Sequence, residues 1–377
     1  MEWVIIHPFG YSRRSEKLEG ILEARGKEFI NLASDYSHVQ KKKIQIDGSQ
    51  TSKIQLIETI SYKKNISIKR LISHIHFSFK ALIYIRKVSP KYIYCRIPPN
   101  ILLFLISNFF KRGTLVVDIY DLWPESFPAE NSKITALFFK VWKYLRDSSI
   151  KKCKVVILEC NYYKKFLPPI NDEKLITVYP EAISNTDYKP VITCLNNIND
   201  SIQFCYLGTI NNIVDFDSID SLFQLISQDL DFIVHFIGRG ESKKRLQESV
   251  MKYGGKFMDY GPIFSDSEKN TIINNCHYGL NLFDKRTVIG LSLKSIEYMK
   301  FGLPIISNLQ GDTKLFIKNF KIGINFSDIK SVGDLLQPYS DNNNLKDKVR
   351  SFYLQEFSRS MAQNRWEDAI RRAENGR

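Results

Sequence analysis

Short apolar runs alternate with helical patterns along the chain, and this alternation is the feature that most constrains its fold. In the first half, apolar runs at 3–6, 28–32, 92–95, 114–119, 155–158 and 176–179 are separated by segments of helical periodicity. The alternation restarts with runs at 204–207, 232–237, 256–260 and 278–283. Strands that alternate with helices form parallel sheets with helices on both faces. The sequence therefore predicts an α/β protein built from Rossmann-like, doubly wound domains.

The chain length favours two such domains. A chain of 377 residues is too long for one hydrophobic core. Periodicity is lost over residues 180–201, which we interpret as an interdomain linker with the boundary near residue 190. This predicts a first domain at 1–190 and a second at 191–357. A helical tail at 358–377 carries Trp366, Ala369 and Ile370, through which we expect it to pack back onto the first domain.

The composition is that of an ordinary globular protein, with 44% apolar and 25% charged residues. No apolar run reaches the ~20 residues needed to span a bilayer, and the start of the chain does not resemble a signal peptide. The six cysteines form no CxxC pair, so we expect buried thiols in a reducing cytoplasm. Neither a metal nor a cofactor is implied by the residue pattern.

Positive charge is concentrated in the first half of the chain. Residues 1–190 carry a net charge of +13, whereas residues 191–377 carry +1. A basic half can face nucleic acid, an anionic membrane surface or a phosphate-bearing lipid, although coding bias also enriches lysine. The helical pattern at 69–87 has cations at both ends and is compatible with a membrane surface or with simple packing on the sheet. The lysines are not interleaved with aromatic residues, which disfavours nucleic acid.

The segment 288–307, VIGLSLKSIEYMKFGLPIIS, predicts a loop, a helix and a buried strand. Ser292 is a plausible N-cap, and Gly302 ends the helix. The loop would open at the carboxyl edge of a sheet, where α/β folds bind ligands. Lys294 and the first helical turn suit a diphosphate, and Glu297 can accept hydrogen bonds from ribose or sugar hydroxyls. The alternative is that Lys294 and Glu297 form an ion pair on a solvated helix face.

Glycines follow successive strands of the second half. Gly208 and Gly238 end two of them, and Arg239 follows Gly238 directly. Such glycines expose backbone N–H groups at the carboxyl edge and suit phosphate binding, although each alone could be a turn. Gly10 ends the first strand of the chain in the same way.

Three carboxylates follow the predicted strand 114–119 in the sequence VVDIYDLWPES. Asp118, Asp121 and Glu125 are expected to cluster at the carboxyl end of this strand. Acids in that position can act as a base towards a hydroxyl or order the loop that receives it, whereas a single Asp there is often only a cap. They are the candidate catalytic residues.

Three segments carry a resemblance to a known family. VVDIYDLWPES, GRGESKKRL and LSLKSIEYMKFGLPII resemble motifs of the bacterial GT-B glycosyltransferases of the group 1, or family 4, type, which build O-antigens, capsules and colanic acid. The last segment is similar to the donor-binding pattern P-x-K-x-x-E-Y-x-x-x-G-x-P. The resemblance covers nearly the whole chain in order and implies two Rossmann-like domains with an interdomain cleft.

The resemblance also implies roles for individual residues. Glu297 would hold the donor ribose and Lys294 the phosphates. Gly208 and Gly238 would lie beneath the diphosphate, and Ile263 beside the base. The family's first glutamate falls on Ile289, so sugar contacts would come from elsewhere, for which Ser292 and backbone N–H groups are candidates. Further departures are Asn211 and Asn212, which replace the usual basic pair and leave Arg239 as a substitute cation, and Tyr120, which stands where relatives often have His.

The resemblance implies a hexosyltransferase that moves a sugar from a nucleoside-diphosphate sugar to a polyprenyl-diphosphate-linked saccharide. We expect Asp121 to contact the acceptor. The enzyme would be cytoplasmic and peripheral to the anionic inner face of the membrane, with no nucleic-acid partner. A sugar-nucleotide 2-epimerase on the same fold is the main alternative, and a nucleic-acid-binding protein is a weaker one.

Overall fold

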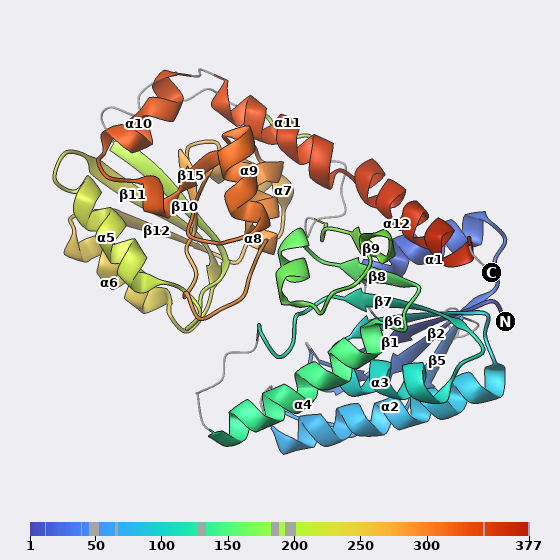
Figure 1. Cartoon of the computed structure of the whole chain (residues 1–377). Coiled ribbons are helices and arrows are strands. Elements are labelled where there is room, and N and C mark those ends of the chain that lie inside the picture. The colour runs from blue at the N-terminus through green and yellow to red at the C-terminus, as the bar shows by residue number, and fades with distance from the viewer. Residues whose placement is uncertain are drawn as a thin grey trace. The chain divides into compact units, whose positions relative to one another are not determined.

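The computed structural model describes residues 1–11, 13–38, 40–44, 53–64, 67–126, 133–181, 188–192, 201–341 and 344–375. The chain divides into two compact units, Met1–Tyr179 with Ala362–Arg377 (unit 1) and Pro180–Met361 (unit 2) (Figure 1). Each unit contains one large parallel sheet, so the predicted α/β class with two doubly wound units is confirmed. Most of the predicted linker at 180–201 lies outside the described residues.

Unit 1 is built around a seven-stranded sheet. Its strands are β1 (Trp3–His7), β2 (Phe29–Ser34), β5 (Ile54–Ile57), β6 (Tyr92–Ile97), β7 (Thr114–Ile119), β8 (Val155–Leu158) and β9 (Leu175–Thr177), with a small antiparallel pair β3 (Tyr36–Ser37) and β4 (Lys42–Lys43). Its helices are α1 (Glu16–Ala24), α2 (Ile68–Val88), α3 (Asn100–Phe109), α4 (Lys133–Ile150) and α12 (Arg359–Glu374), with short 3₁₀ turns at Arg13–Ser15, Asn161–Phe166 and Asp172–Lys174.

Helices cover both faces of this sheet. In Figure 1, α2, α3 and α4 lie on one face, while α1 and α12 lie on the other. One apolar cluster joins β1, β6 and β8 to α1 and α12, and it includes Trp366, Ala369 and Ile370 of the C-terminal helix. The last helix of the chain therefore belongs to the core of unit 1, although the residues before it belong to unit 2.

Unit 2 is built around a six-stranded sheet. Its strands are β10 (Ser201–Thr209), β11 (Asp231–Arg239), β12 (Lys256–Gly261), β13 (Tyr278–Asn281), β14 (Ile305–Ser307) and β15 (Gly323–Asn325). Its helices are α5 (Phe216–Ile226), α6 (Lys243–Lys252), α7 (Asp266–Ile273), α8 (Leu293–Lys300), α9 (Asp312–Phe320), α10 (Gly333–Ser340) and α11 (Leu345–Phe357), with a 3₁₀ turn at Phe326–Asp328.

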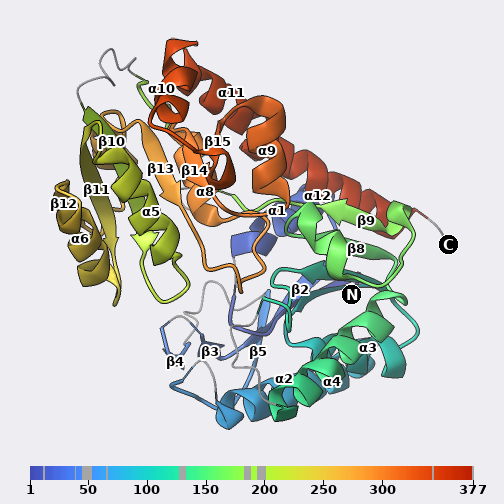
Figure 2. The same cartoon turned by 60° about the vertical axis from the view of Figure 1, so that its left-hand side comes forward.

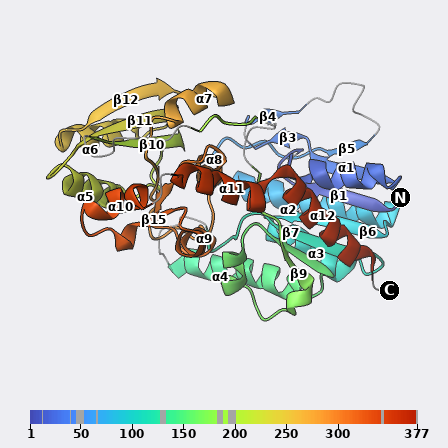
Figure 3. The same cartoon turned by 90° about the horizontal axis from the view of Figure 1, so that it is seen from above.

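The core of unit 2 lies mainly between the sheet and three helices. Apolar side chains of α5, α6 and α10 pack against β10, β11 and β13, with Phe223 and Phe236 among the fully buried residues. Helices α5 and α6 lie side by side on that face (Figure 2 and Figure 3). On the opposite side, α8 packs against α11.

Each sheet has one point where the strand order reverses. In unit 1 the order is β5-β2-β1-β6-β7-β8-β9, so the chain winds outward in both directions from β1. In unit 2 the order is β12-β11-β10-β13-β14-β15, and the corresponding point lies between β10 and β13. Ligands of open α/β sheets bind beyond the carboxyl ends of the strands at such switch points. The topology therefore marks one candidate binding edge in each unit.

Tyr298 of α8 occupies the switch point of unit 2. Strands β10 and β13 pair only at two positions, Phe204↔Tyr278 and Cys205↔Gly279. Beyond them, the Tyr298 hydroxyl accepts a hydrogen bond from the Leu207 N–H at 2.8 Å and lies 3.0 Å and 3.2 Å from the carbonyl oxygens of Cys205 and Leu280. One buried phenol thus satisfies backbone groups that the diverging strands cannot offer each other.

Two predictions from composition can be compared with the structure. Among the described residues, no helix is long and apolar enough to cross a membrane. The cysteines at 95, 153, 160, 205 and 276 are free and buried, as expected, whereas Cys194 lies outside the described residues.

Replacing Tyr298 with Phe should destabilise unit 2. The substitution keeps the ring and removes the hydroxyl, which leaves the Leu207 N–H buried without an acceptor, at a cost of about 1–3 kcal/mol. Urea unfolding should show a lower midpoint for Tyr298→Phe, while Tyr144→Phe, at an exposed site on α4, should match wild type. Equal midpoints for both variants would contradict this role of the hydroxyl.

Candidate functional site

The N-terminus of α8 is held at the carboxyl edge of the second sheet by a buried polar network. The Ser292 hydroxyl accepts a hydrogen bond from the Ser295 N–H at 3.1 Å, so its predicted role as N-cap is confirmed. The same hydroxyl donates to Asn281 at the end of β13, and the Asn281 amide reaches Ser307 at the end of β14. The Ser292 hydroxyl is engaged by other protein groups. A ligand at this position would therefore meet the first turn of α8 rather than the Ser292 side chain.

Lys294 extends from the first turn of α8 over aromatic rings. Its ammonium nitrogen lies 3.7 Å from the ring centre of Tyr206 on β10 and 5.3 Å from that of Phe283 beyond β13. No carboxylate among the described residues lies within ion-pair distance of it. Burial lowers the pKa of Lys294 to about 7, against a weaker opposing effect of Cys205. The amine thus changes between its neutral and charged forms near pH 7, and its charged form lies over aromatic ring faces at the switch point.

Glu297 has different neighbours. Only 1% of the residue is exposed, and its carboxylate lies 3.8 Å from the Lys269 ammonium of α7. Lys269 also approaches Asp266, which pairs with Lys300 at 2.6 Å. These four residues form a buried ion network between α7 and α8.

The alternative interpretation of Lys294 and Glu297 as an ion pair on a solvated helix face is therefore wrong. Lys294 reaches towards β10, whereas Glu297 faces α7. The helix is also largely buried rather than solvated, including Ile296 and Tyr298 at 0% exposure. The two side chains do not converge on a common point in this structure.

Gly208 and Gly238 are glycines for different local reasons. Gly208 has φ of +101° with open space where a side chain would be, which fits a close approach of a ligand or a plain turn. A Cβ on Gly238 would lie 1.9 Å from the Gly208 carbonyl oxygen, so sheet pairing alone demands glycine there. Arg239 is exposed at the end of β11, and Ile263 is half-buried in the loop after β12.

The loop after β1 in unit 1 also requires glycine. Gly10 has φ of +87°, and a Cβ there would lie 2.9 Å from the Ile44 side chain. This residue is buried at the carboxyl edge of the first sheet.

The three candidate carboxylates do not act as one cluster, because each has its own partner. Asp118 is fully buried and accepts two hydrogen bonds from Arg14, at 2.6 Å and 2.9 Å, and one from Tyr94. The side-chain oxygens of Asp118 are therefore engaged by Arg14 and Tyr94 and are not offered to a shared acidic site. A buried carboxylate bound in this way positions its surroundings and has no surface to offer a substrate.

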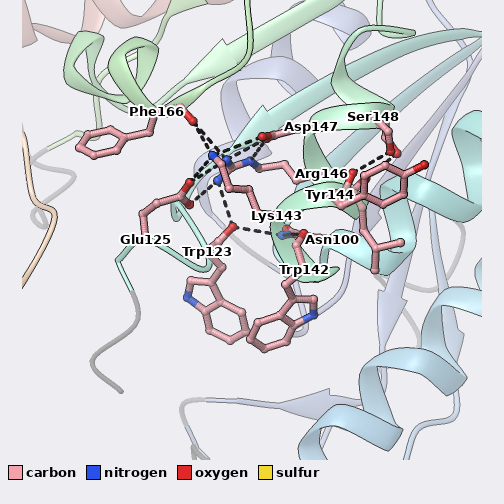
Figure 4. A network of polar contacts seen from close by, with 12 residues as sticks. Asn100, Trp123, Glu125, Trp142, Lys143, Tyr144, Arg146, Asp147, Ser148 and Phe166 are labelled. Atoms are coloured by element: carbon pink, nitrogen blue, oxygen red, sulfur yellow. Dashed lines mark hydrogen bonds and ion pairs between the residues drawn. The ribbon is translucent and has the colours of Figure 1, made fainter. Parts of the chain in front are cut away.

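Glu125 is held by Arg146, a guanidinium with 0% exposure on α4. The two form paired contacts of 2.6 Å and 2.9 Å, and Lys143 adds a contact of 2.7 Å (Figure 4). Arg146 also donates to the Trp123 carbonyl, so the network fastens the loop after β7 to α4. Although burial opposes it, the hydrogen bonds from Arg146 and Lys143 hold the pKa of Glu125 below its usual range.

Asp121 differs from Asp118 and Glu125 because its side-chain hydrogen bonds come from neutral donors. It is half-buried and accepts hydrogen bonds from the Trp123 indole at 2.7 Å and from Ser126. Burial raises its pKa, while these donors and the charge of Arg70 act in the opposite direction. Its carboxylate therefore combines partial exposure with a fixed orientation.

Two further titratable groups at this edge were not predicted. Glu159 follows β8 directly, and burial together with Asp121 and Asp118 raises its pKa to about 8, against Arg14. His7 closes β1 with Nε2 2.8 Å from the Asn31 side-chain oxygen, and burial lowers its pKa to about 4. Their place at strand ends is the only signal in the sequence that could have indicated them.

Comparison with known proteins bears on the fold alone. No family model matches the sequence, and no curated protein is similar to it. Solved structures do match over the whole length. The lipopolysaccharide outer core galactosyltransferase WaaB, in its apo form, is 14% identical with a TM-score of 0.62, covering 98% of this chain and 99% of the other.

Two further matches are a protein in complex with a nucleotide and a protein assigned a different activity. Anabaena Alr3699/HepE in complex with UDP is 12% identical with a TM-score of 0.61, over 98% of this chain and 100% of the other. A Listeria monocytogenes protein assigned as a UDP-N-acetylglucosamine 2-epimerase is 12% identical with a TM-score of 0.55, over 98% of this chain and 95% of the other. At such identities the similarity shows a GT-B-like fold of two parallel α/β sheets, as expected from the sequence, and does not by itself choose an activity.

Replacing Glu125 with Gln should reduce stability, because it removes one of the two carboxylates that pair with the buried Arg146 guanidinium and leaves Asp147 as its acidic partner. Loss of the sole partner of a buried charge costs about 3–5 kcal/mol, so with Asp147 still in place we expect a loss at or below the lower end of this range. Since the folded-state pKa of Glu125 is lowered, its contribution is present above the unfolded-state pKa near ~4.3 and is lost as pH falls through the folded-state value.

Urea unfolding at pH 7 and at acid pH checks both statements. The difference between wild type and Glu125→Gln should be large at pH 7 and shrink at acid pH, while Glu173→Gln, at an exposed site, should match wild type throughout. A difference that does not depend on pH would contradict the assignment.

Proposed function

We propose that this protein is a glycosyltransferase that moves a sugar from a nucleoside-diphosphate sugar to a lipid-diphosphate-linked acceptor in surface polysaccharide synthesis. The observation that carries the proposal is Lys294, a cation over aromatic rings beside the switch point of unit 2. The departing nucleoside diphosphate develops negative charge, and a cation at the start of a helix stabilises it.

The donor would bind at the carboxyl edge of unit 2. Lys294 and the first turn of α8 would hold the diphosphate, with Arg239 as a second cation and Gly208 and Gly238 giving backbone access. Ile263 would lie beside the base. UDP is the nucleotide named for the HepE complex and is the first to test.

Glu297 is the proposed contact to the donor ribose. Its position on α8 supports this role, and the carboxylate can accept two hydroxyl hydrogen bonds. Because it is 1% exposed and faces Lys269, ribose binding would require the side chains between α7 and α8 to rearrange.

The acceptor would bind at the carboxyl edge of unit 1. Asp121 is the proposed contact to the acceptor hydroxyl, since it combines partial exposure with a fixed carboxylate. Asp118 and Glu125 would position the loop around it through Arg14 and Arg146.

An apolar face on unit 1 supports peripheral attachment to the inner face of the cytoplasmic membrane. On α2, five large apolar residues at helical spacing are exposed: Ile68, Ile72, Ile75, Phe79 and Ile83, with exposures from 36% to 77%. On α4, Leu137, Val141 and Tyr144 are exposed by 51% to 65%. Both helices cover the same face of the sheet (Figure 1). Exposed cations such as Lys69 and Lys140 accompany them, which suits an anionic lipid surface.

Lys294→Met should weaken UDP binding about tenfold or more, since a hydrogen bond to a charged group contributes about 1.5–3 kcal/mol. Binding needs the protonated lysine, which the free protein holds mainly below pH 7. Wild-type affinity should therefore fall as pH rises above about 7, by up to about tenfold per pH unit.

Isothermal titration calorimetry of UDP and sugar nucleotides, between pH 6 and pH 9, measures both effects. Any pH dependence of affinity that remains in Lys294→Met comes from ionisation of the nucleotide. Lys244→Met, at an exposed site on α6, should bind as wild type does. Glu297→Ala tests the ribose contact in the same series. Failure of every nucleotide to bind the wild type would exclude the proposed function.

A sugar-nucleotide 2-epimerase is the second candidate, favoured by the structural match to a protein assigned that activity. An epimerase needs no acceptor and converts the nucleotide sugar alone. Incubating candidate donors with and without a lipid-linked acceptor, followed by product analysis, separates the two. Transfer that requires the acceptor supports the glycosyltransferase, and a new sugar nucleotide formed without it supports the epimerase.

Placing a carboxylate in the apolar face should release the protein from membranes. Ile72→Asp with Phe79→Asp removes two apolar contacts of about 1.5–3 kcal/mol each and adds repulsion from anionic lipid. Co-sedimentation with vesicles containing phosphatidylglycerol should fall at least about tenfold. Met251→Asp, at an exposed apolar site on α6, is the control. Equal loss in both variants would exclude this face as the contact.

A further inference from the structure

A group of cations, imidazoles and aromatic rings surrounds the start of α2 in unit 1. We call it the Arg70 cluster, and it consists of Phe9, His38, Lys41, Tyr62, Arg70, His74 and Trp123. These residues come from the loop after β1, the segment around β3 and β4, the segment before α2, α2 itself and the loop after β7. The cluster thus joins segments far apart in the sequence.

Arg70 stands at the centre of the cluster. It lies in the first turn of α2, whose N-cap is Ser67, and is 8% exposed. Its guanidinium carbon is 4.7 Å from the ring centre of Trp123 and 5.6 Å from that of Phe9. Its Nε donates to Nε2 of His74 at 3.4 Å. Ring faces hold the guanidinium in one orientation next to the positive end of the helix.

Lys41 and His38 form the more open side of the cluster, and both are half-buried. The Lys41 ammonium lies 3.3 Å from Nδ1 of His38 and 5.1 Å from the ring centre of Tyr62. The Tyr62 hydroxyl lies 2.9 Å from the same Nδ1. With Nδ1 as acceptor of both donors, the neutral His38 ring carries its proton on Nε2, where it can donate to a ligand.

The charges of the cluster repel one another. Burial, then Arg70 and Lys41, lower the pKa of His38 to about 4. Burial, then Arg70 and His38, lower the pKa of His74 to about 3. Asp121 is the acid that acts on Arg70, while burial raises the pKa of Tyr62 to about 12 and keeps it neutral. The electrostatic potential at the two imidazoles is therefore positive, because of Arg70 and Lys41.

Resting on the function proposed above, we propose that the Arg70 cluster binds the diphosphate of the lipid-linked acceptor. Arg70, Lys41 and the His38 Nε2–H supply donors of the kind that anionic oxygens accept. Ile68, with 77% exposure, begins the apolar stripe of α2 at the same end of the helix as Arg70, so a lipid tail and its diphosphate would meet the same end of α2. Asp121 acts electrostatically on Arg70 and would lie towards the sugar end of the same acceptor.

Imidazole signals in NMR test the proposal, because the chain has six histidines and two of them belong to the cluster. The intact protein is first saturated with UDP, which occupies unit 2, and is then titrated with inorganic pyrophosphate or with geranyl diphosphate. Binding at the cluster should shift the His38 signal and raise its pKa by more than about one unit, since the added anion favours the imidazolium.

Lys41→Met should weaken pyrophosphate binding about tenfold or more, whereas Lys111→Met, at an exposed site after α3, should leave it unchanged. Tighter binding of geranyl diphosphate than of pyrophosphate would identify the lipid-linked form as the ligand. Equal binding of the two would assign the site to a free diphosphate group and overturn the lipid part of the proposal.

The UDP step separates the two hypotheses. If UDP fails to bind, the proposed function fails. If UDP binds but neither diphosphate moves the His38 signal, or if only His235 and His277 of unit 2 respond, the Arg70 cluster is not the acceptor site. The same conclusion follows if Lys41→Met and wild type bind pyrophosphate equally.

Discussion

The divergence of β10 and β13 is the constraint on which unit 2 depends. Two strands that separate at their carboxyl ends leave backbone groups without partners, and the Tyr298 hydroxyl supplies them. A Cβ on Gly279 would lie 2.5 Å from the Tyr298 ring, so glycine at that position is required for the ring to enter. Because Tyr298 belongs to α8, the same contact fixes the helix that carries Lys294. One side chain thus stabilises both the sheet and the candidate binding edge.

Buried charged side chains in this protein have two kinds of surroundings. Asp118 and Glu125 are neutralised by Arg14 and Arg146 in buried pairs that fasten loops to the rest of unit 1. Lys294 and Arg70 instead have aromatic rings around their charge. A buried ion pair has little affinity left for a ligand, whereas a cation over ring faces keeps much of its field. This difference is why Lys294 and Arg70, rather than the paired Arg14 and Arg146, carry the proposed phosphate contacts.

Much of the fold could be predicted from the sequence because parallel strands that are buried on both faces are continuous apolar runs. The predicted strands at 114–119 and 155–158 coincide with β7 and β8, and the helix predicted at 69–87 differs from α2 by one residue at each end. The buried strand predicted within 288–307 is β14, at Ile305–Ser307. Its start could not be predicted, because Pro304 cannot donate to the ladder and a short apolar run gives little register information. Local patterns determine elements well and their ends less well.

The site was less predictable because its contacts join distant parts of the chain. Asp118 and Arg14 are 104 positions apart, and no local pattern indicates that this acid is neutralised. Arg70 was part of a helical pattern whose ends looked merely basic, and its ring neighbours lie on separate segments. In contrast, the Ser292 cap involves only residues within one turn and was predicted correctly. Sequence patterns report local geometry, whereas charge partners depend on the topology.

The loop before α8 is held in place by a contact between its main chain and α9. Ile289 has no group that could accept a hydrogen bond from a sugar hydroxyl, so polar contacts on that side would come from the backbone. The Gly290 carbonyl accepts hydrogen bonds from both the N–H and the hydroxyl of Thr313 on α9, each at 2.9 Å. Backbone groups bind a ligand well only when they are held in place before it arrives. Thr313 therefore makes the loop a fixed surface, which is what a site needs when its specificity rests on main-chain atoms.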